Sequence, residues 1–110
     1  MASDVRVVFV TVPNEEVALT ISKQLVEERL VACVNIVPGL RSVYRWQGQI
    51  EDEQEHLLIC KTSEERLDAM IPRVAEIHPY TVPEVIALSV AEGHSPYLDW
   101  VLAQTSVLSE

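Results

Sequence analysis

The segment VRVVFVTV, residues 5–12, limits the fold more than any other stretch of this chain. It is rich in β-branched residues and almost uninterruptedly apolar, a pattern typical of a strand that is covered on both faces. Asn14 follows as a candidate helix cap. The spacing behind it predicts an amphipathic helix with one buried stripe, made of Val17, Ile21 and Leu25. A strand followed at once by such a helix indicates a mixed fold.

A long hairpin is predicted in the middle of the sequence. VACVNIV indicates a second strand, which Pro38 and Gly39 interrupt in the manner of a turn or a bulge. The segments RSVYRW and QIEDEQEHLLICKT then pair across a turn at Gln47 and Gly48.

Two helices and one strand complete the predicted order. Thr62 and Glu65 have the spacing of a capping box, so a helix should start there and bury four apolar residues, Leu67, Met70, Ile71 and Val74. Residues 84–91 predict the last strand. Ser95 is a cap before Pro96, and together they open a C-terminal helix over Tyr97, Val101 and Leu102.

The whole chain, residues 1–110, is therefore predicted to form one α+β domain. The order βαββαβ is that of ferredoxin-like domains, here with an additional C-terminal helix, and two helices then pack on one face of the sheet. We expect the other face to include or adjoin Tyr44, Trp46, Leu58 and Val90. A chain of this size has too little left to cover them, which favours oligomers.

Composition restricts the possible partners. Hydrophobic residues make up 48% of the chain and charged residues 23%, which indicates a globular protein. The 8 basic and 17 acidic residues give a net charge of −9, so we expect a cation and not a nucleic acid or an anionic membrane. The sequence shows no secretory leader or spanning segment, and Cys33 and Cys60 suggest buried, reduced thiols. We therefore expect a cytoplasmic protein without a membrane partner.

Several motifs resemble a known family. The segments ACVNIVPG, YRWQG, KT, HPYTVPE and YLDW occur in the order and spacing of the CutA family, the divalent-cation tolerance proteins. The resemblance runs from about residue 7 to residue 100. It implies a ferredoxin-like subunit in a tight homotrimer, in which long hairpins from neighbouring subunits complete an architecture similar to that of PII signalling proteins. It also implies a link to copper and other divalent cations, and it brings no well-established catalytic reaction.

The stretch HPYTVPE, residues 78–84, has two interpretations. Its prolines restrict the residues before them to extended backbone, which predicts a stiff lead-in to the last strand with His78 as a hydrogen-bonded residue. Alternatively, His78 and Glu84 supply an imidazole and a carboxylate, donors suited to copper, zinc or nickel. The resemblance links copper to this region and to a first-strand cysteine, whose place is taken here by Val10. We therefore predict weak binding of Cu(II) or another divalent cation.

Other polar and aromatic residues are further candidates. Residues 51–55 lack the spacing and the glycine of an EF-hand, which favours a solvated hairpin tip over a cation site. Lys61 ends an apolar strand, either as a snorkelling cation or as the partner of an anion in a cleft between subunits. Four aromatic residues either pack in an interface or line such a ligand-binding cleft with Lys61, namely Trp46, Tyr80, Tyr97 and Trp100.

Two functions of different classes follow. The first is a non-enzymatic, homotrimeric protein that binds a divalent cation or a small-molecule ligand in a copper-tolerance or metal-response role. The second is an enzyme on the same fold, such as an acylphosphatase-like hydrolase, since ferredoxin-like domains carry several chemistries. A hydrolase of that kind needs a glycine-rich phosphate cradle, and the three glycines, at positions 39, 48 and 93, form no such loop. The sequence therefore favours the first function, without catalytic residues.

Overall fold

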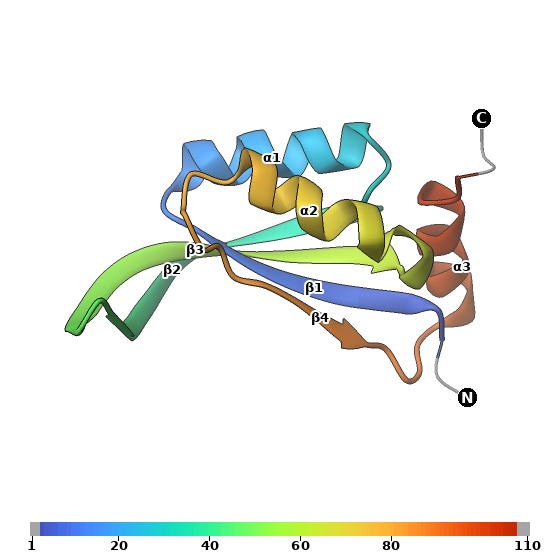
Figure 1. Cartoon of the computed structure of the whole chain (residues 1–110). Helices are drawn as coiled ribbons and strands as arrows, with labels where there is room; N and C mark the ends of the chain where they lie inside the picture. Colours follow the sequence, from blue (N-terminus) through green and yellow to red (C-terminus); the bar gives the residue numbers. More distant parts are fainter. Residues whose placement is uncertain (1–2, 108–110) are drawn as a thin grey trace.

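The computed structural model describes residues 3–107 of the protein. Strands and helices are interspersed along this part of the chain, with the second and third strands in direct succession (Figure 1). In chain order they are β1 (Val5–Val12), α1 (Glu15–Glu27), β2 (Cys33–Trp46), β3 (Gln49–Ser63), a 3₁₀ helix (Glu64–Arg66), α2 (Leu67–Ile77), β4 (Val85–Ser89) and α3 (Ser95–Gln104).

The four strands form one antiparallel sheet in the order β2-β3-β1-β4. This is the strand order of a ferredoxin-like domain, so the predicted α+β fold with an additional C-terminal helix is confirmed. The helices α1 and α2 contact each other and cover one face of the sheet (Figure 1). The helix α3 lies instead at the end of the sheet nearest the N-terminus (Figure 1).

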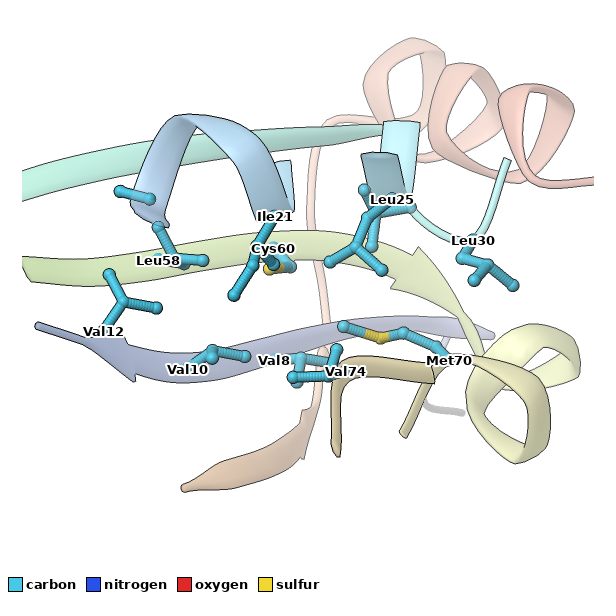
Figure 2. Packing of buried hydrophobic residues seen from close by; sticks show 12 residues of the cluster. Val8, Val10, Val12, Ile21, Leu25, Leu30, Leu58, Cys60, Met70 and Val74 are labelled. Atoms are coloured by element: carbon cyan, nitrogen blue, oxygen red, sulfur yellow. The ribbon is translucent and has the colours of Figure 1, made fainter. Parts of the chain in front are cut away.

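The core lies between the sheet and the first two helices (Figure 2). Alternate residues of β1 and β3 point into it, because successive side chains of a strand face opposite ways. Each of the following residues is at most 1% exposed: Val8, Val10, Val12, Leu58 and Cys60 from the sheet, and Ile21, Leu25, Met70 and Val74 from the helices. Burying one such aliphatic side chain contributes about 1.5–3 kcal/mol to stability. The prediction that Leu58 lies on the uncovered face is wrong, because Leu58 pairs with Val10 and shares its core-facing side.

The opposite face of the sheet, which we call the open face, is apolar as well. It carries the residues of β1 and β3 that alternate with the core, and their partners on β2 and β4. Val37 is 40%, Ile86 51% and Leu88 43% exposed. One end of this face is covered, because Val101 of α3 packs there against Val5, Ala32 and Val90. The described chain therefore leaves the rest of the open face in solvent.

The hairpin of β2 and β3 extends past the helices as a long arm (Figure 1). Its predicted turn is confirmed: Gln47 and Gly48 both have positive φ, at 51° and 81°, as a two-residue type I′ turn requires. The predicted irregularity at Pro38 and Gly39 is a β-bulge, since the pairing register shifts by one residue between Val37 and Leu40. Gly39 has φ of 77°, a conformation that favours glycine.

The cap of α1 is the one predicted from the sequence, whereas the cap predicted for α2 is not present. The Asn14 side chain accepts a hydrogen bond from Val17 N at 2.9 Å, which confirms the predicted cap. Thr62 is not a cap, because it is fully buried and its hydroxyl donates to the carbonyl oxygen of Leu30 at 2.6 Å. The 3₁₀ turn separates it from α2, and Ile71 faces solvent, 38% exposed, against the prediction that it is buried.

The last strand and the last helix are also shorter or shifted relative to prediction. The strand β4 covers residues 85–89 only, so Glu84 precedes it. The cap position of α3 is His94, one residue before the predicted Ser95, and Pro96 lies in the first turn as expected. No helix among residues 3–107 is long and apolar enough to cross a membrane.

Candidate functional site

A groove of about 770 Å³ lies where the hairpin arm meets the segment between α2 and β4. Volumes of this size are typical of sites for small molecules. The arm contributes alternate residues that share the orientation of the open face, among them Tyr44, Trp46, Glu51, Glu53 and Glu55. Residues 79–82 and Glu84 form the opposite wall. Two predicted cleft residues, Trp46 and Tyr80, and one predicted metal ligand, Glu84, are therefore brought together here.

Glu55 and Tyr80 join the two walls of the groove. The Tyr80 hydroxyl donates a hydrogen bond to Glu55 Oε2 at 2.7 Å. Glu55 is only 6% exposed. Burial, and next the hydrogen bond to the Glu55 carboxylate, raise the pKa of Tyr80 well above its usual value, because both disfavour a second negative charge. Tyr80 therefore stays protonated and remains a hydrogen-bond donor at neutral pH.

Glu53 and Glu51 continue the row of carboxylates along β3. They follow Glu55 at alternate positions, so all three point to the same side of the arm. The Tyr44 hydroxyl donates to Glu53 Oε1 at 3.3 Å. Partial desolvation, and next the charge of Glu53, raise the pKa of Tyr44. Glu53 is exposed, in agreement with the predicted solvated run, whereas the prediction is wrong for Glu55, which is buried within β3.

His78 is buried beside the groove, 7% exposed, and both ring nitrogens are in use. Its Nε2 lies 2.8 Å from the carbonyl oxygen of Thr11, which can only accept, so Nε2 carries the proton. Its Nδ1 accepts from the backbone N–H of Tyr80 at 3.1 Å. The ring also contacts that of Tyr80, with centroids 4.6 Å apart. In this conformation neither nitrogen offers a free lone pair to a metal ion.

The predicted metal site at His78 and Glu84 stays a prediction. Glu84 is exposed, lines the groove and forms no ion pair with residues 3–107. In the same part of the chain, no three His, Cys, Asp or Glu side chains are close enough together to hold one ion. The hydrogen-bonded lead-in, which was the alternative interpretation of HPYTVPE, accounts for the contacts of His78.

The other predicted cleft residues lie at the far end of the open face, next to α3. The Lys61 ammonium donates to Asn35 Oδ1. The Tyr97 hydroxyl lies 3.5 Å from Cys33 Sγ, a contact that, with partial burial, raises the pKa of Tyr97 to about 12. Tyr97 and Trp100 are adjacent rings, with centroids 5.7 Å apart. The residues proposed from sequence for one cleft therefore form two separate groups.

Sequence reasoning missed the glutamates as groove residues. Glu51, Glu53 and Glu55 were considered as part of an acidic run, whereas the informative signal is their spacing of two, which places them on one side of a strand. Tyr44 and Trp46 have the same spacing on the paired strand, and Tyr44 lies directly opposite Glu51. A hairpin with aromatic residues on one strand and carboxylates on the other, all facing one way, predicts such a groove.

The fold and the groove define a class of small ferredoxin-like proteins with an open apolar face, a projecting hairpin arm and an acidic, aromatic groove. The family model of the CutA1 divalent ion tolerance protein matches residues 6–104. The chain belongs to this family.

Individual relatives agree with this assignment. The chain is 59% identical over 99 residues to the divalent-cation tolerance protein CutA of Thermus thermophilus, covering 90% of this chain and 96% of that protein. It is 47% identical to human protein CutA, covering 93% of this chain and 57% of the human protein. The crystal structure of CutA from Xylella fastidiosa superposes with a TM-score of 0.92 at 45% identity, covering 94% of this chain and all of that one.

Proposed function

We propose that the protein is a homotrimeric, non-enzymatic metal-response protein with a PII-like architecture, which binds Cu(II) or another divalent cation weakly. The family and the relative from Thermus thermophilus are both named for tolerance of divalent cations. None of the names reported above denotes an enzyme. The two thiols, Cys33 and Cys60, are unpaired, which supports a reducing, cytoplasmic location.

The open face is the observation that carries the proposed assembly. Ile86 and Leu88 on β4 and Val37 on β2 are each at least 40% exposed, and the arm adds Tyr44 and Trp46 at 40% and 43%. Such contiguous apolar surface is typical of an interface, because removing apolar surface from water is favourable by about 25 cal/mol per Å² before the entropic cost of association is subtracted. The threefold state is supported by the resemblance of the hairpin arm to the arms of the CutA family.

The groove supports weak binding of a metal ion. Its carboxylates attract cations, and Glu84 is free to ligate. His78 can ligate through Nδ1 only after that atom releases the Tyr80 N–H, and breaking a hydrogen bond of this kind costs about 1 kcal/mol. We therefore expect Cu(II) to bind more tightly than Zn²⁺, following the Irving–Williams order, and Mg²⁺ hardly at all.

Light scattering at micromolar concentration tests the assembly. We expect three times the chain mass of 12.4 kDa. A stable monomer would show that the open face is not an interface, and the trimer proposal would be abandoned.

Calorimetric titration with Cu(II) tests the metal site. We expect His78→Ala to weaken binding by about tenfold, or 1.4 kcal/mol. Because His78 is buried, Glu84→Gln serves as the second variant, since this exposed residue leaves the core intact. If both variants bind Cu(II) as tightly as the parent protein, HPYTVPE is only a stiff lead-in to β4 and the proposed site is wrong.

A further inference from the structure

Opposite charges lie at the two ends of one row of side chains on β3. Glu55, Leu57, Ile59 and Lys61 occupy alternate positions of this strand, so all four point to the side of the open face. Leu57 and Ile59 are partly buried apolar residues between the two charges. Lys61 follows Glu55 by six residues. At about 3.3 Å per residue the two lie about 20 Å apart along the strand, so they cannot meet within one chain.

Lys61 is the one cation on the open face of the described strands. The other basic residues of these strands, Arg6, Arg41 and Arg45, point to the opposite side, because their pairing partners on β3 do. Within the described part of the chain, Lys61 has no carboxylate partner. Its ammonium donates to Asn35 Oδ1, which is neutral. An ammonium group has three donors, so Lys61 can still bind a carboxylate.

Glu55 is the complementary case at the other end of the row. It is 6% exposed, and it accepts a hydrogen bond from the neutral Tyr80 hydroxyl. Among residues 3–107 no basic side chain forms an ion pair with it. A buried carboxylate without a counter-charge is unfavourable, and an ammonium group covered by an apolar interface is unfavourable for the same reason. Each end of the row therefore needs the charge that the other end carries.

A second copy of the chain can supply both charges. In a cyclic assembly each subunit uses one surface toward one neighbour and a different surface toward the other. The carboxylate of one row can then meet the ammonium group of the next, while the apolar residues of the open faces pack together. Complementary charges of this kind fix the register of two subunits and disfavour other arrangements.

We propose that Lys61 of each subunit forms an ion pair with Glu55 of the neighbouring subunit, across the interface of the open faces. The inference rests on the proposed homotrimer and names the contact that sets its register. Glu55 lies in the groove with Tyr80, whereas Lys61 pairs with Cys33, which Tyr97 contacts. The ion pair therefore brings the two separate groups of predicted cleft residues into one cleft between subunits.

A double-mutant cycle tests the ion pair. Lys61→Met keeps an apolar stem and Glu55→Gln keeps an acceptor for Tyr80, while each removes one charge. Sedimentation velocity on serial dilution in moderate urea gives the association constant. We expect each single variant to lower it by about tenfold or more, because the partner charge is left buried and unpaired. The double variant should associate no more weakly than the weaker single variant, since both charges are gone.

Additive effects in this cycle overturn the proposal, because additivity is the expected behaviour of two residues that do not touch. Light scattering of the parent protein separates the possible failures. A trimeric parent with additive effects refutes this ion pair alone, whereas a monomeric parent refutes the proposed assembly itself.

Carbodiimide coupling gives a second readout, because the reagent joins a carboxylate to an amine in direct contact. The chain has two lysines, so Lys23→Arg leaves Lys61 as the only one. In this background we expect chains linked to one another on a denaturing gel. Adding Lys61→Arg keeps the charge but cannot couple, and adding Glu55→Gln removes the acid, so both should lose the link. Glu65→Gln, at an exposed position, should keep it. A link that persists in Glu55→Gln overturns the assigned partner.

Discussion

His78 Nε2 donates a hydrogen bond to the carbonyl oxygen of Thr11 at 2.8 Å, which fastens the segment after α2 to the end of β1. The same ring receives the Tyr80 N–H on Nδ1, and the Tyr80 hydroxyl reaches Glu55 on the arm. One imidazole thus positions the wall of the groove opposite the carboxylates. His78, a candidate metal ligand by sequence, uses both ring nitrogens in this structure to hold the groove wall in place through hydrogen bonds.

His78→Ala should therefore destabilise the protein. Two hydrogen bonds are lost in a buried setting, so we expect the free energy of unfolding to fall by about 2 kcal/mol. His78→Asn can retain an acceptor for the Tyr80 N–H and should lose less. Urea unfolding followed by circular dichroism measures both variants. An alanine variant as stable as the parent would mean that these bonds contribute nothing.

Tyr80→Phe removes only the hydroxyl that Glu55 accepts from. The buried carboxylate then loses the one donor that it has among residues 3–107, so we expect a cost of about 1–3 kcal/mol in urea unfolding. Tyr97→Phe is the matched control, because Tyr97 is exposed and the one hydrogen-bond contact of its hydroxyl within the described part of the chain is that with Cys33 at 3.5 Å. Its effect should stay within about 0.5 kcal/mol. Equal costs for the two variants would contradict a special role for the contact with Glu55.

The raised pKa of the buried Cys60 thiol predicts that the protein loses stability at alkaline pH. Burial raises the pKa of its thiol from 9.0 to about 12. The unfolded chain therefore releases this proton first, and the stability from the buried neutral thiol is complete below about pH 9 and lost as the pH rises toward 12. Its share of the slope approaches about 1.4 kcal/mol per pH unit. Urea unfolding at pH 8, 9.5 and 10.5 should show a shallower decline for Cys60→Ala than for Cys33→Ala, and parallel profiles would refute the assignment.

The open face predicts a charge substitution that separates the subunits. Leu88→Lys places an ammonium group on β4 in the middle of the proposed interface, where its desolvation is unfavourable. We expect a lower mass in light scattering at micromolar concentration. Leu19→Lys changes an equally exposed leucine on α1, at 42% against 43%, and should leave the mass unchanged. A Leu88→Lys protein with the parental mass would place the interface elsewhere.

Local patterns in the sequence predicted the elements that they alone determine. The strand β1, the Asn14 cap and the turn at Gln47 and Gly48 each depend on neighbouring residues only, and all three are present as predicted. The cover expected on both faces of β1 is present on the helix side, while much of the other face stays open in the described chain. Thr62 had an equally good local pattern, but its hydroxyl is used by Leu30, 32 residues away along the chain. A contact over such a distance has no signature in local spacing.

The candidate site was also predictable only in part, because some of its contacts join residues that are far apart in the sequence. The sequence marked Trp46, Tyr80 and Glu84, which do line the groove, because aromatic and acidic residues stand out in a short motif. It could not show that Glu55 is buried, since that depends on Tyr80 reaching over from the other wall. Nor could it show that Lys61 and Tyr97 belong to the opposite end of the sheet.

The bulge at Pro38 and Gly39 changes which residues of β2 face each side of the sheet. Before it, odd-numbered residues of β2 such as Asn35 share the side of the open face, and after it even-numbered residues such as Tyr44 do. Deleting one residue at the bulge would make β2 regular and would still place Tyr44 opposite Glu51, because the bulge is what absorbs the extra residue. If the full sequence instead ran as a regular strand from Val37 onward, the distal half of β2 would be turned over and would present Val43 and Arg45 to the carboxylates in place of the two aromatic rings. The bulge, some distance from the groove, therefore decides which side chains of β2 face the carboxylates.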